Sequence, residues 1–424
     1  MKQEADLLVS NCRQLLTLQN PSVSTRRGRL LGDLGLVQDG MIAAYHGRIV
    51  AAGPESKVTE QISFTPGGIT VDAGHSVVMP GFVDCHTHTV FANYRLDEYE
   101  WRIAGRPYAE IAKAGGGIAK SVSDVRGMSE KTLLAVSRKR LNGCISNGST
   151  TIEIKSGYGL DLENELKQLR VIRELDRLSP VTIVPTFCGA HSVPPEYAQD
   201  REAYIDLVVN EMIPVVAKEG LAEYVDVFCE TGVFTVPEAE RILRAAVELG
   251  LKARLHADEL SDVGAADLAV RLTAISADHL TKISPSTVVR LADSSVIAVL
   301  LPGTSFGLPS LQFAPAREMV NKGVAIAIAS DFNPGSSPSE SMSMMIAIAC
   351  SHMRLSPAEA IAAATYNAAF VVGREREVGS LEVGKRADFL ILDCEDYREI
   401  PYRFGINPVR QVFVGGRLWS REDA

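Results

Sequence analysis

The feature that most constrains the fold of this 424-residue chain is an alternation of short apolar segments with longer amphipathic ones between residues 80 and 330. Eight apolar segments occur, at 80–85, 149–155, 181–188, 224–229, 251–256, 274–279, 296–302 and 324–330. They are short and contain many β-branched residues, which is typical of buried strands. Between them, LENELKQLRVIRELDRL and VPEAERILRAAVELG repeat apolar residues every three or four positions, which indicates helices.

Strands that are apolar throughout, each followed by a helix, indicate a parallel sheet that is covered on both faces. Because there are eight such strands, we predict a (β/α)₈ barrel of the TIM type rather than an open, doubly wound sheet. The chain is also too long for one compact core, so a further domain is expected beside the barrel.

The two ends of the chain differ from this middle part. Both contain short β-type segments broken by glycine, and HGR at 46–48 suggests a hairpin turn. We therefore predict a small β-sandwich domain built from both termini, with residues 1–79 and 378–424 on either side of a barrel formed by residues 80–377.

Charge and cysteine usage limit the partners and the location of the protein. The net charge is −9 and no basic cluster is present, which argues against a nucleic acid or an anionic membrane as partner. The chain has no apolar run of 18 residues, no recognisable signal peptide and seven scattered cysteines without a C-x-x-C pair. We expect reduced thiols, no membrane span and a cytoplasmic location.

The chemistry is expected where the strands end. His86 and His88 follow the first apolar run, and residues i and i+2 of a strand point to the same side, so both imidazoles face one site. In a barrel of this kind the active site lies at the carboxyl ends of the strands. Further polar residues stand at later strand ends: Lys155 and Tyr158, His191, His256 and Glu259, His279, and Asp331.

Three imidazoles and one carboxylate, from His86, His88, His256 and Asp331, predict a mononuclear site for Zn²⁺ or Fe²⁺. Such an ion acidifies water, and Glu259 or His279 would move the protons, with Asp331 as a third candidate. The residues therefore predict metal-assisted hydrolysis of a C–N bond. The fourth strand ends at Glu230 without a lysine to bridge a second ion, which favours a single metal.

Two further residues have both a structural and a functional interpretation. Lys155 is either a general base or a partner in an ion pair. Arg95 either pairs on the surface or binds a substrate carboxylate, which a guanidinium holds with two hydrogen bonds.

The chain resembles the amidohydrolase superfamily in PGFVDCHTH at 80–88 and GSLEVGKRADFLILD at 379–393. EIKSGYGL, TFCGAHSVPPEY, DVFCETGVFT, HADE and SDFNPGSSP are similar to segments of the imidazolonepropionases. Members of that family hydrolyse the ring C–N bond of 4-imidazolone-5-propanoate to N-formimino-L-glutamate in histidine degradation, with zinc or iron.

The resemblance implies the same four metal ligands, proton transfer by Glu259 and His279, and a homodimer. It also implies a group of residues that bind substrate or product: Arg95, Tyr158, His191, Glu259, Asn333, Gly335 and Ser336. The chain departs from the family at Asn93 and Tyr94, where the usual residues are glycine and serine. This bulkier pair is expected to tilt Arg95 or to narrow the pocket.

Two competing functions are considered. Other amidohydrolases of cyclic amides, and aminohydrolases of purines and pyrimidines, would keep the metal site but lack the segments KSGYG and NPGSSP together. A metal-free scaffold protein should have lost at least one ligand, whereas all four are present here.

Overall fold

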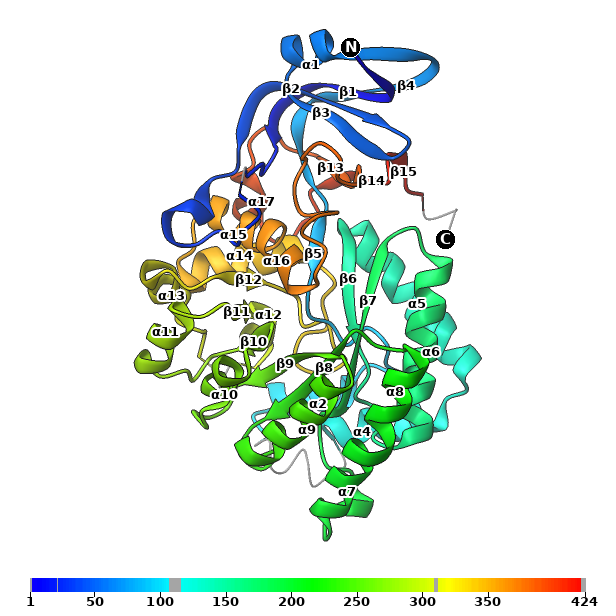
Figure 1. Ribbon diagram of the computed structural model, residues 1–424, viewed down its shortest axis with the longest axis vertical. Helices are drawn as coiled ribbons and strands as arrows, with labels where there is room; N and C mark the ends of the chain where they lie inside the picture. The colour runs from blue at the N-terminus through cyan, green and yellow to red at the C-terminus, as the bar shows by residue number, and fades with distance from the viewer. Residues whose placement is uncertain (1, 21, 107–115, 309–311, 421–424) are drawn as a thin grey trace.

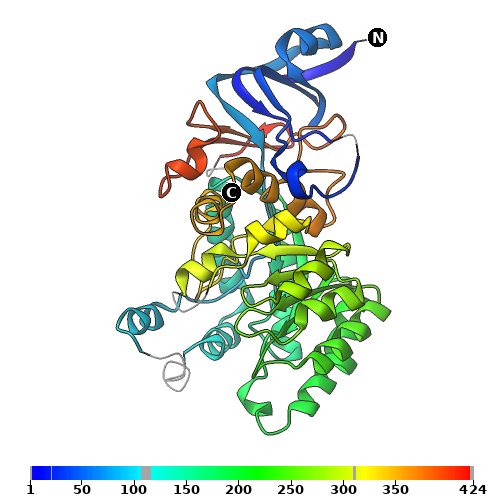
Figure 2. The same ribbon diagram turned by 90° about the vertical axis from the view of Figure 1, so that its left-hand side faces the viewer.

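The computed structural model describes residues 2–20, 22–106, 116–308 and 312–420. Figure 1 shows a barrel with surrounding helices and, above it, a smaller sheet in which the beginning and the end of the chain lie together. The perpendicular view in Figure 2 shows the same arrangement. Both the predicted barrel and the predicted composite domain are therefore confirmed.

Eight strands form the barrel sheet, in the order in which they occur along the chain. They are β5 (Phe82–Asp84), β6 (Ser149–Lys155), β7 (Thr182–Ala190), β8 (Tyr224–Cys229), β9 (Lys252–Ala257), β10 (Ser276–His279), β11 (Ile297–Leu300) and β12 (Ile326–Ile328). All neighbouring pairs are parallel. Each strand overlaps one of the eight predicted segments, because a strand buried on both faces needs apolar side chains on both.

The barrel closes beyond the ends of its first and last strands. Thr87 and Phe332 form a parallel bridge. The His88 N–H donates to the Phe332 carbonyl at 2.8 Å, and the Asp331 N–H donates to the His86 carbonyl at 3.0 Å. This closure brings the H-x-H segment and Asp331 side by side, although they are more than 240 positions apart in the chain.

Helices surround the barrel between the strands. They are α2 (Leu96–Ile103), α4 (Ile118–Gly127), α5 (Glu130–Ser146), α6 (Leu162–Leu178), α7 (Arg201–Leu207), α8 (Ile213–Glu219), α9 (Val236–Glu248), α10 (Ala265–Leu272), α11 (Pro285–Ala292), α12 (Pro302–Gly307), α13 (Ala316–Lys322), α14 (Met342–Met353), α15 (Pro357–Ala363) and α16 (Tyr366–Val371). The predicted helices at 162 and 236 are α6 and α9. The sequence marks their starts: the Asp161 side chain caps α6, and Thr235 with Glu238 forms a capping box on α9.

The small domain is one seven-stranded sheet in the order β15-β14-β13-β4-β1-β2-β3. Its strands are β1 (Gln3–Leu16), β2 (Leu36–Tyr45), β3 (Arg48–Pro54), β4 (Ile62–Pro80), β13 (Phe389–Leu392), β14 (Val409–Val414) and β15 (Arg417–Leu418). Two helices, α1 (Glu55–Gln61) and α17 (Glu399–Tyr402), accompany them. The predicted hairpin joins β2 to β3, with positive φ angles of 49° at His46 and 76° at Gly47.

Strand β4 connects the two bodies, because it ends at Pro80 and β5 starts at Phe82. It pairs with β1 in parallel and with β13 in antiparallel orientation, so it joins the N-terminal strands to the C-terminal ones. We retain residues 80–377 as the proposed extent of the barrel domain.

In the described part of the chain no helix is long and apolar enough to cross a membrane. The seven cysteines are all free thiols, as the sequence predicted.

Candidate active site

The predicted metal ligands converge at the carboxyl ends of the strands. His86 and His88 follow β5, His256 lies in β9, and Asp331 follows β12. All four side chains are buried, with 3% exposure or less. The structure therefore brings together residues that come from three separate parts of the chain.

The distances within this cluster suit a small divalent ion. The carboxylate Oδ1 of Asp331 lies 3.5 Å from His86 Nε2 and 3.7 Å from His88 Nε2. His88 Nε2 lies 3.4 Å from His256 Nε2. An ion that binds nitrogen and oxygen at about 2.0–2.2 Å in tetrahedral geometry needs ligand atoms roughly 3–4 Å apart. The three measured distances fall in that range.

Hydrogen bonds fix which nitrogen faces the cluster in two of the three imidazoles, those of His86 and His256. His86 Nδ1 lies 2.5 Å from the Asp278 carboxylate, and His256 Nδ1 lies 2.9 Å from Asp226 Oδ1. Each Nδ1 therefore carries the proton and leaves Nε2 with a free lone pair. His86 Nε2 is buried and has no hydrogen-bond partner among the described residues. Lone pairs pointing at one buried position are what a cation requires, so the residues fit a metal.

Two candidates for proton transfer lie beside the ligands. The Glu259 carboxylate is 3.6 Å from His279 Nδ1. The His279 ring centroid is 5.7 Å from that of His86 and 5.1 Å from that of His256. Burial, together with the nearby Asp331, raises the pKa of Glu259 to about 8. Both ring nitrogens of His279 are buried without a hydrogen-bond partner.

His191 and Tyr158 form one wall of the site. The His191 ring stacks on that of His88, with centroids 4.8 Å apart and an angle of 12° between the planes. His191 Nδ1 donates to the Gly157 carbonyl at 3.0 Å, which leaves Nε2 as an acceptor. Burial lowers the pKa of His191 to about 3, so the ring is neutral. The Tyr158 ring centroid lies 5.4 Å from that of His191.

Arg95 lies against Gly335. A Cβ atom at position 335 would be 1.4 Å from Arg95 Nη2, so only glycine leaves room for the guanidinium. The Arg95 N–H donates to the Pro334 carbonyl at 3.1 Å. Among the residues that the structure describes, Arg95 Nε is buried without a hydrogen-bond partner, although Nη1 lies 3.5 Å from Glu98. The guanidinium thus keeps donor capacity for a ligand.

Arg102 is a second arginine at this place, which the sequence did not single out. Its Nη2 donates to the Gly335 carbonyl at 2.9 Å, while Nε and Nη1 are buried and have no hydrogen-bond partner in the described part of the chain. Arg95 is the residue that precedes α2 and Arg102 lies seven positions further on, about two helical turns away, in its last turn. Their spacing of seven residues was the feature of the sequence that could have identified Arg102 as a partner of Arg95.

Asn333 shapes the loop that follows β12. Its Oδ1 accepts from the N–H groups of Gly335 and Ser336, and its Nδ2 donates to the Asp331 carbonyl and to Ser336 Oγ. An amide has two donor hydrogens and two lone pairs, so its capacity is used inside the loop. In this structure Asn333 therefore positions Gly335 and Ser336.

Tyr94 packs outside this arrangement of polar groups. Its ring makes an edge contact with Phe91 at 5.0 Å, and the Arg140 guanidinium lies 5.2 Å from its centroid. Arg140 also donates to the carbonyls of Phe91 and Ala92. Tyr94 thus packs edge-on against a neighbouring ring, and the Arg95 backbone keeps its hydrogen bond to Pro334.

Five charged residues lie directly beneath the cluster, and of these only Lys155 has an interpretation from the sequence. Asp226 and Asp278 are the partners of His256 and His86, and they are joined by three further charges: Glu153, Lys155 and Arg254. All five are fully buried. A charge inside an otherwise apolar strand, such as Glu153 in STTIEIK or Arg254 in LKARLH, was the signal that could have found them.

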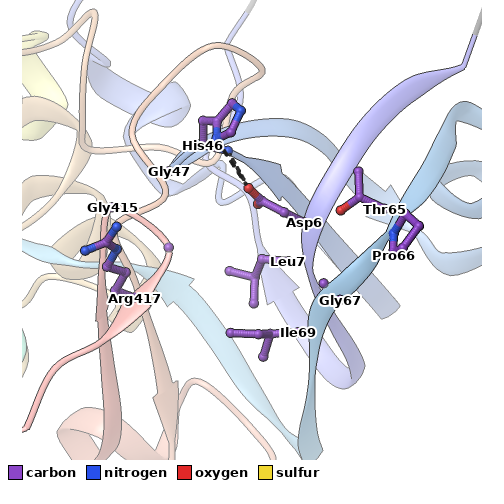
Figure 3. A pocket seen from close by; sticks show the side chains of 12 residues that line it. Asp6, Leu7, His46, Gly47, Thr65, Pro66, Gly67, Ile69, Gly415 and Arg417 are labelled. Atoms are coloured by element: carbon purple, nitrogen blue, oxygen red, sulfur yellow. Dashed lines mark hydrogen bonds and ion pairs between the residues drawn. The ribbon is translucent and has the colours of Figure 1, made fainter.

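A hollow of about 480 Å³ lies elsewhere, in the small domain. Figure 3 shows it between the His46-Gly47 turn, the segment from Thr65 to Ile69, and the turn at Gly415. The only interaction drawn there is the hydrogen bond from the His46 N–H to Asp6 Oδ2, at 2.9 Å. It contains none of the predicted site residues.

The comparisons with known proteins show the family to which the chain is similar. A model of the amidohydrolase family matches residues 77–419. The imidazolonepropionase of Symbiobacterium thermophilum is 49% identical over 414 residues, and that of Geobacillus kaustophilus is 45% identical over 413 residues. Each alignment covers 97% of both chains.

Solved structures share the fold. Guanine deaminase of E. coli has a TM-score of 0.74 at 14% identity and covers 97% of this chain and 98% of its own. An adenosine deaminase from Xanthomonas campestris with bound zinc has a TM-score of 0.71 at 18% identity, with coverage of 99% and 93%.

Proposed function

Because the chain belongs to the amidohydrolase family and, within it, to the imidazolonepropionases, we propose that the imidazole and carboxylate cluster at the barrel mouth carries out that family's reaction. The reaction is hydrolysis of the ring C–N bond of 4-imidazolone-5-propanoate to N-formimino-L-glutamate, a step of histidine degradation. The observation that carries the residue assignment is the convergence of Asp331 Oδ1 with the Nε2 atoms of His86 and His88.

The proposed ligands of one divalent metal per subunit are His86, His88, His256 and Asp331. When bound, the metal supplies Lewis acidity, which polarises the ring carbonyl and acidifies water. Both Zn²⁺ and Fe²⁺ suit three imidazoles and a carboxylate. The zinc bound to the structurally similar adenosine deaminase supports Zn²⁺ as the first ion to test.

The chain's own groups handle the protons. Water adds its oxygen to the ring carbonyl carbon, the bond from that carbon to the ring nitrogen breaks, and the nitrogen gains a proton. Glu259 takes the proton from the attacking water at its carboxylate and delivers it to the leaving nitrogen. His279 is 3.6 Å from Glu259 and stabilises the developing charge on the carbonyl oxygen.

The remaining residues bind and orient the substrate. Arg95 holds the propanoate carboxylate with the donors that are not used within the protein. Tyr158 and His191 bond the ring nitrogens, since His191 offers an acceptor at Nε2. Ser336 and the backbone of Gly335, which Asn333 holds in place, complete the pocket.

We further propose that the protein is a homodimer located in the cytoplasm. The support for the dimer is the family resemblance. The support for the location is the set of seven unpaired cysteines.

The experiment that tests the proposal is turnover of 4-imidazolone-5-propanoate by the purified chain, with formation of N-formimino-L-glutamate as the readout. A chelator-treated sample and a His256→Ala variant should both lose activity by at least about a hundredfold. His352→Ala is the matched control, because that ring stacks on Phe313 outside the cluster, and it should keep full activity.

Turnover that survives both chelation and His256→Ala would contradict the metal site. Hydrolysis of hydantoins, dihydroorotate or amino-purines in preference to the imidazolone would keep the site but reject the substrate.

A further inference from the structure

The buried charged side chains beneath the proposed metal site form one connected network of ion pairs. Its members are three carboxylates, Glu153, Asp226 and Asp278, and two cations, Lys155 and Arg254, all with 0% exposure. Glu153 lies in β6, a strand that supplies none of the proposed ligands. Its place in the chain of charges nevertheless connects it to strands that do.

Glu153 touches the H-x-H segment directly. Its Oε2 accepts from the N–H of Thr87, the residue between His86 and His88, at 3.0 Å. The Glu153 carbonyl accepts from Thr87 Oγ1 at 2.7 Å, and the Lys155 N–H donates to the Thr87 carbonyl at 2.9 Å. The backbone that carries two ligands is therefore held from β6.

Glu153 also reaches a third ligand through Lys155. Glu153 Oε1 lies 2.8 Å from Lys155 Nζ, which lies 2.7 Å from Asp226 Oδ2. The other oxygen of Asp226 is the partner of His256 Nδ1. Burial opposes the charge on Lys155, as does Arg254, but Asp226 and Glu153 reverse the effect and raise its pKa.

A second branch returns to His86. Arg254 Nη1 lies 3.3 Å from Glu153 Oε1, and Arg254 Nη2 lies 2.8 Å from Asp278 Oδ2. Asp278 Oδ2 is the partner of His86 Nδ1. Arg254 also donates to the Cys85 carbonyl at 2.7 Å, next to His86.

We propose that Glu153 is a positioning residue that sets the affinity of the site for its metal, by holding His86, His88 and His256 through Thr87, Lys155 and Arg254. The inference rests on the proposed metal site. Glu153 touches neither substrate nor ligand atoms, so it acts through these three residues. Lys155 is then a fixed cation between two carboxylates and not a general base.

The physical reason lies in how a metal selects its site. Binding is strong when the ligands already stand at the correct distances, and loss of the groups that orient them weakens affinity by 10- to 100-fold. In this barrel the imidazoles of His86 and His256 are both connected, through their aspartate partners and one cation each, to the carboxylate of Glu153. A shift of Glu153 therefore disturbs several ligands at once.

The test measures Zn²⁺ affinity of the full chain, after chelation and dialysis, by competition with a fluorescent chelator. Glu153→Gln removes the charge, and Glu153→Asp keeps the charge but withdraws the carboxylate from Thr87. We expect the dissociation constant to rise at least about tenfold in both variants. Glu165→Gln is the matched control, since Glu165 is equally buried but accepts from the N–H groups of Gly157, Gly159 and Leu160.

Wild-type affinity in folded Glu153→Asp overturns the positioning role, because a charge at this depth would then suffice. If Glu153→Gln does not fold, Glu153→Asp decides alone. A His256→Ala variant tests the metal site itself. If His256→Ala abolishes Zn²⁺ binding and the Glu153 variants bind Zn²⁺ as tightly as the wild type, only the inference about Glu153 fails. When neither the wild type nor any variant binds Zn²⁺, the proposed metal site fails with it.

Discussion

At the scale of single residues, the contact between Gly335 and Arg95 sets the position of the guanidinium that we propose to bind the substrate carboxylate. A side chain at position 335 would occupy the space of the guanidinium, since its Cβ would stand 1.4 Å from Nη2. The absence of a side chain is thus what allows the arginine to lie over this loop.

Gly335→Ala should displace Arg95 and raise KM for the imidazolone about tenfold or more, with a smaller change in kcat, because a charge-assisted hydrogen bond is worth about 1.5–3 kcal/mol. Steady-state kinetics check this. Gly53→Ala is the control, because a Cβ at that position meets nothing within 4 Å. An unchanged KM in Gly335→Ala would show that Arg95 does not bind the substrate.

Tyr94 replaces a serine that is usual in the family, and the structure gives it contacts with Phe91 and Arg140. Tyr94→Ser should therefore leave KM within about twofold and lower the melting temperature by a few degrees, since it removes a half-buried aromatic ring. Calorimetry and kinetics on one preparation test both halves. A strong fall in KM would mean that the tyrosine narrows the pocket after all.

Asp388 supplies a pH dependence in the small domain. It accepts from the Gly415 N–H at 2.7 Å and lies 3.0 Å from Arg386, but burial raises its pKa from 3.8 to about 6. A carboxyl group whose pKa is raised on folding binds its proton more tightly in the folded state, so it favours folding at low pH. This contribution disappears as the pH rises through 6.

The wild type should accordingly lose about 1 kcal/mol of stability relative to Asp388→Asn between pH 5 and pH 8. Melting temperatures of both proteins, measured across this range, give the difference. A difference that is constant with pH would contradict the raised pKa.

At the scale of elements, α2 presents two arginines to the loop after β12. Arg95 precedes its first turn and Arg102 lies in its last, and both contact Gly335. Two guanidiniums with unused donors at one place indicate a binding position for a carboxylate.

Arg102→Met keeps an unbranched apolar stem but removes the guanidinium and its charge, and it should raise KM about 10-fold with little effect on Zn²⁺ affinity. The product, which has an additional carboxylate, should inhibit this variant less than the wild type. Arg290→Met, which removes a surface ion pair with Asp267, is the control. Equal KM values in the two variants would show that Arg102 does not bind the substrate and only holds the loop after β12.

At the scale of the whole molecule, the proposed metal links segments that are far apart in the chain. The ligands follow the first barrel strand, lie in the fifth and follow the eighth. An ion that binds only the folded arrangement stabilises it by mass action.

Removal of the metal should therefore lower the melting temperature by several degrees, and added Zn²⁺ should restore it, because saturation a hundredfold above the dissociation constant is worth about 2.7 kcal/mol. Scanning fluorimetry with and without chelator measures this. The His256→Ala variant should respond to neither. A wild-type transition that is unaffected by chelator would argue against a structural contribution of the ion.

Local patterns in the sequence predict the alternation of strands and helices, the eightfold count and the types of residue at the strand ends. Each of these depends on local patterns, since a strand buried on both faces must be apolar and a histidine pair spaced by two must share a side. The hairpin at His46 and the starts of α6 and α9 were predictable for the same reason. The resemblance of seven short segments then identified the family.

The pairing of the charges inside the barrel depends on the tertiary structure, because closure of the sheet brings strands together that are far apart in the chain. Glu153 and Arg254 are 101 positions apart. No local sequence pattern predicts that their side chains lie in contact beneath His86, which follows a different strand. The closure of the barrel sets these contacts, just as it sets Arg102 and Gly335 beside each other. Single charges in apolar strands were visible in the sequence, but their partners were fixed by the geometry of the closed sheet.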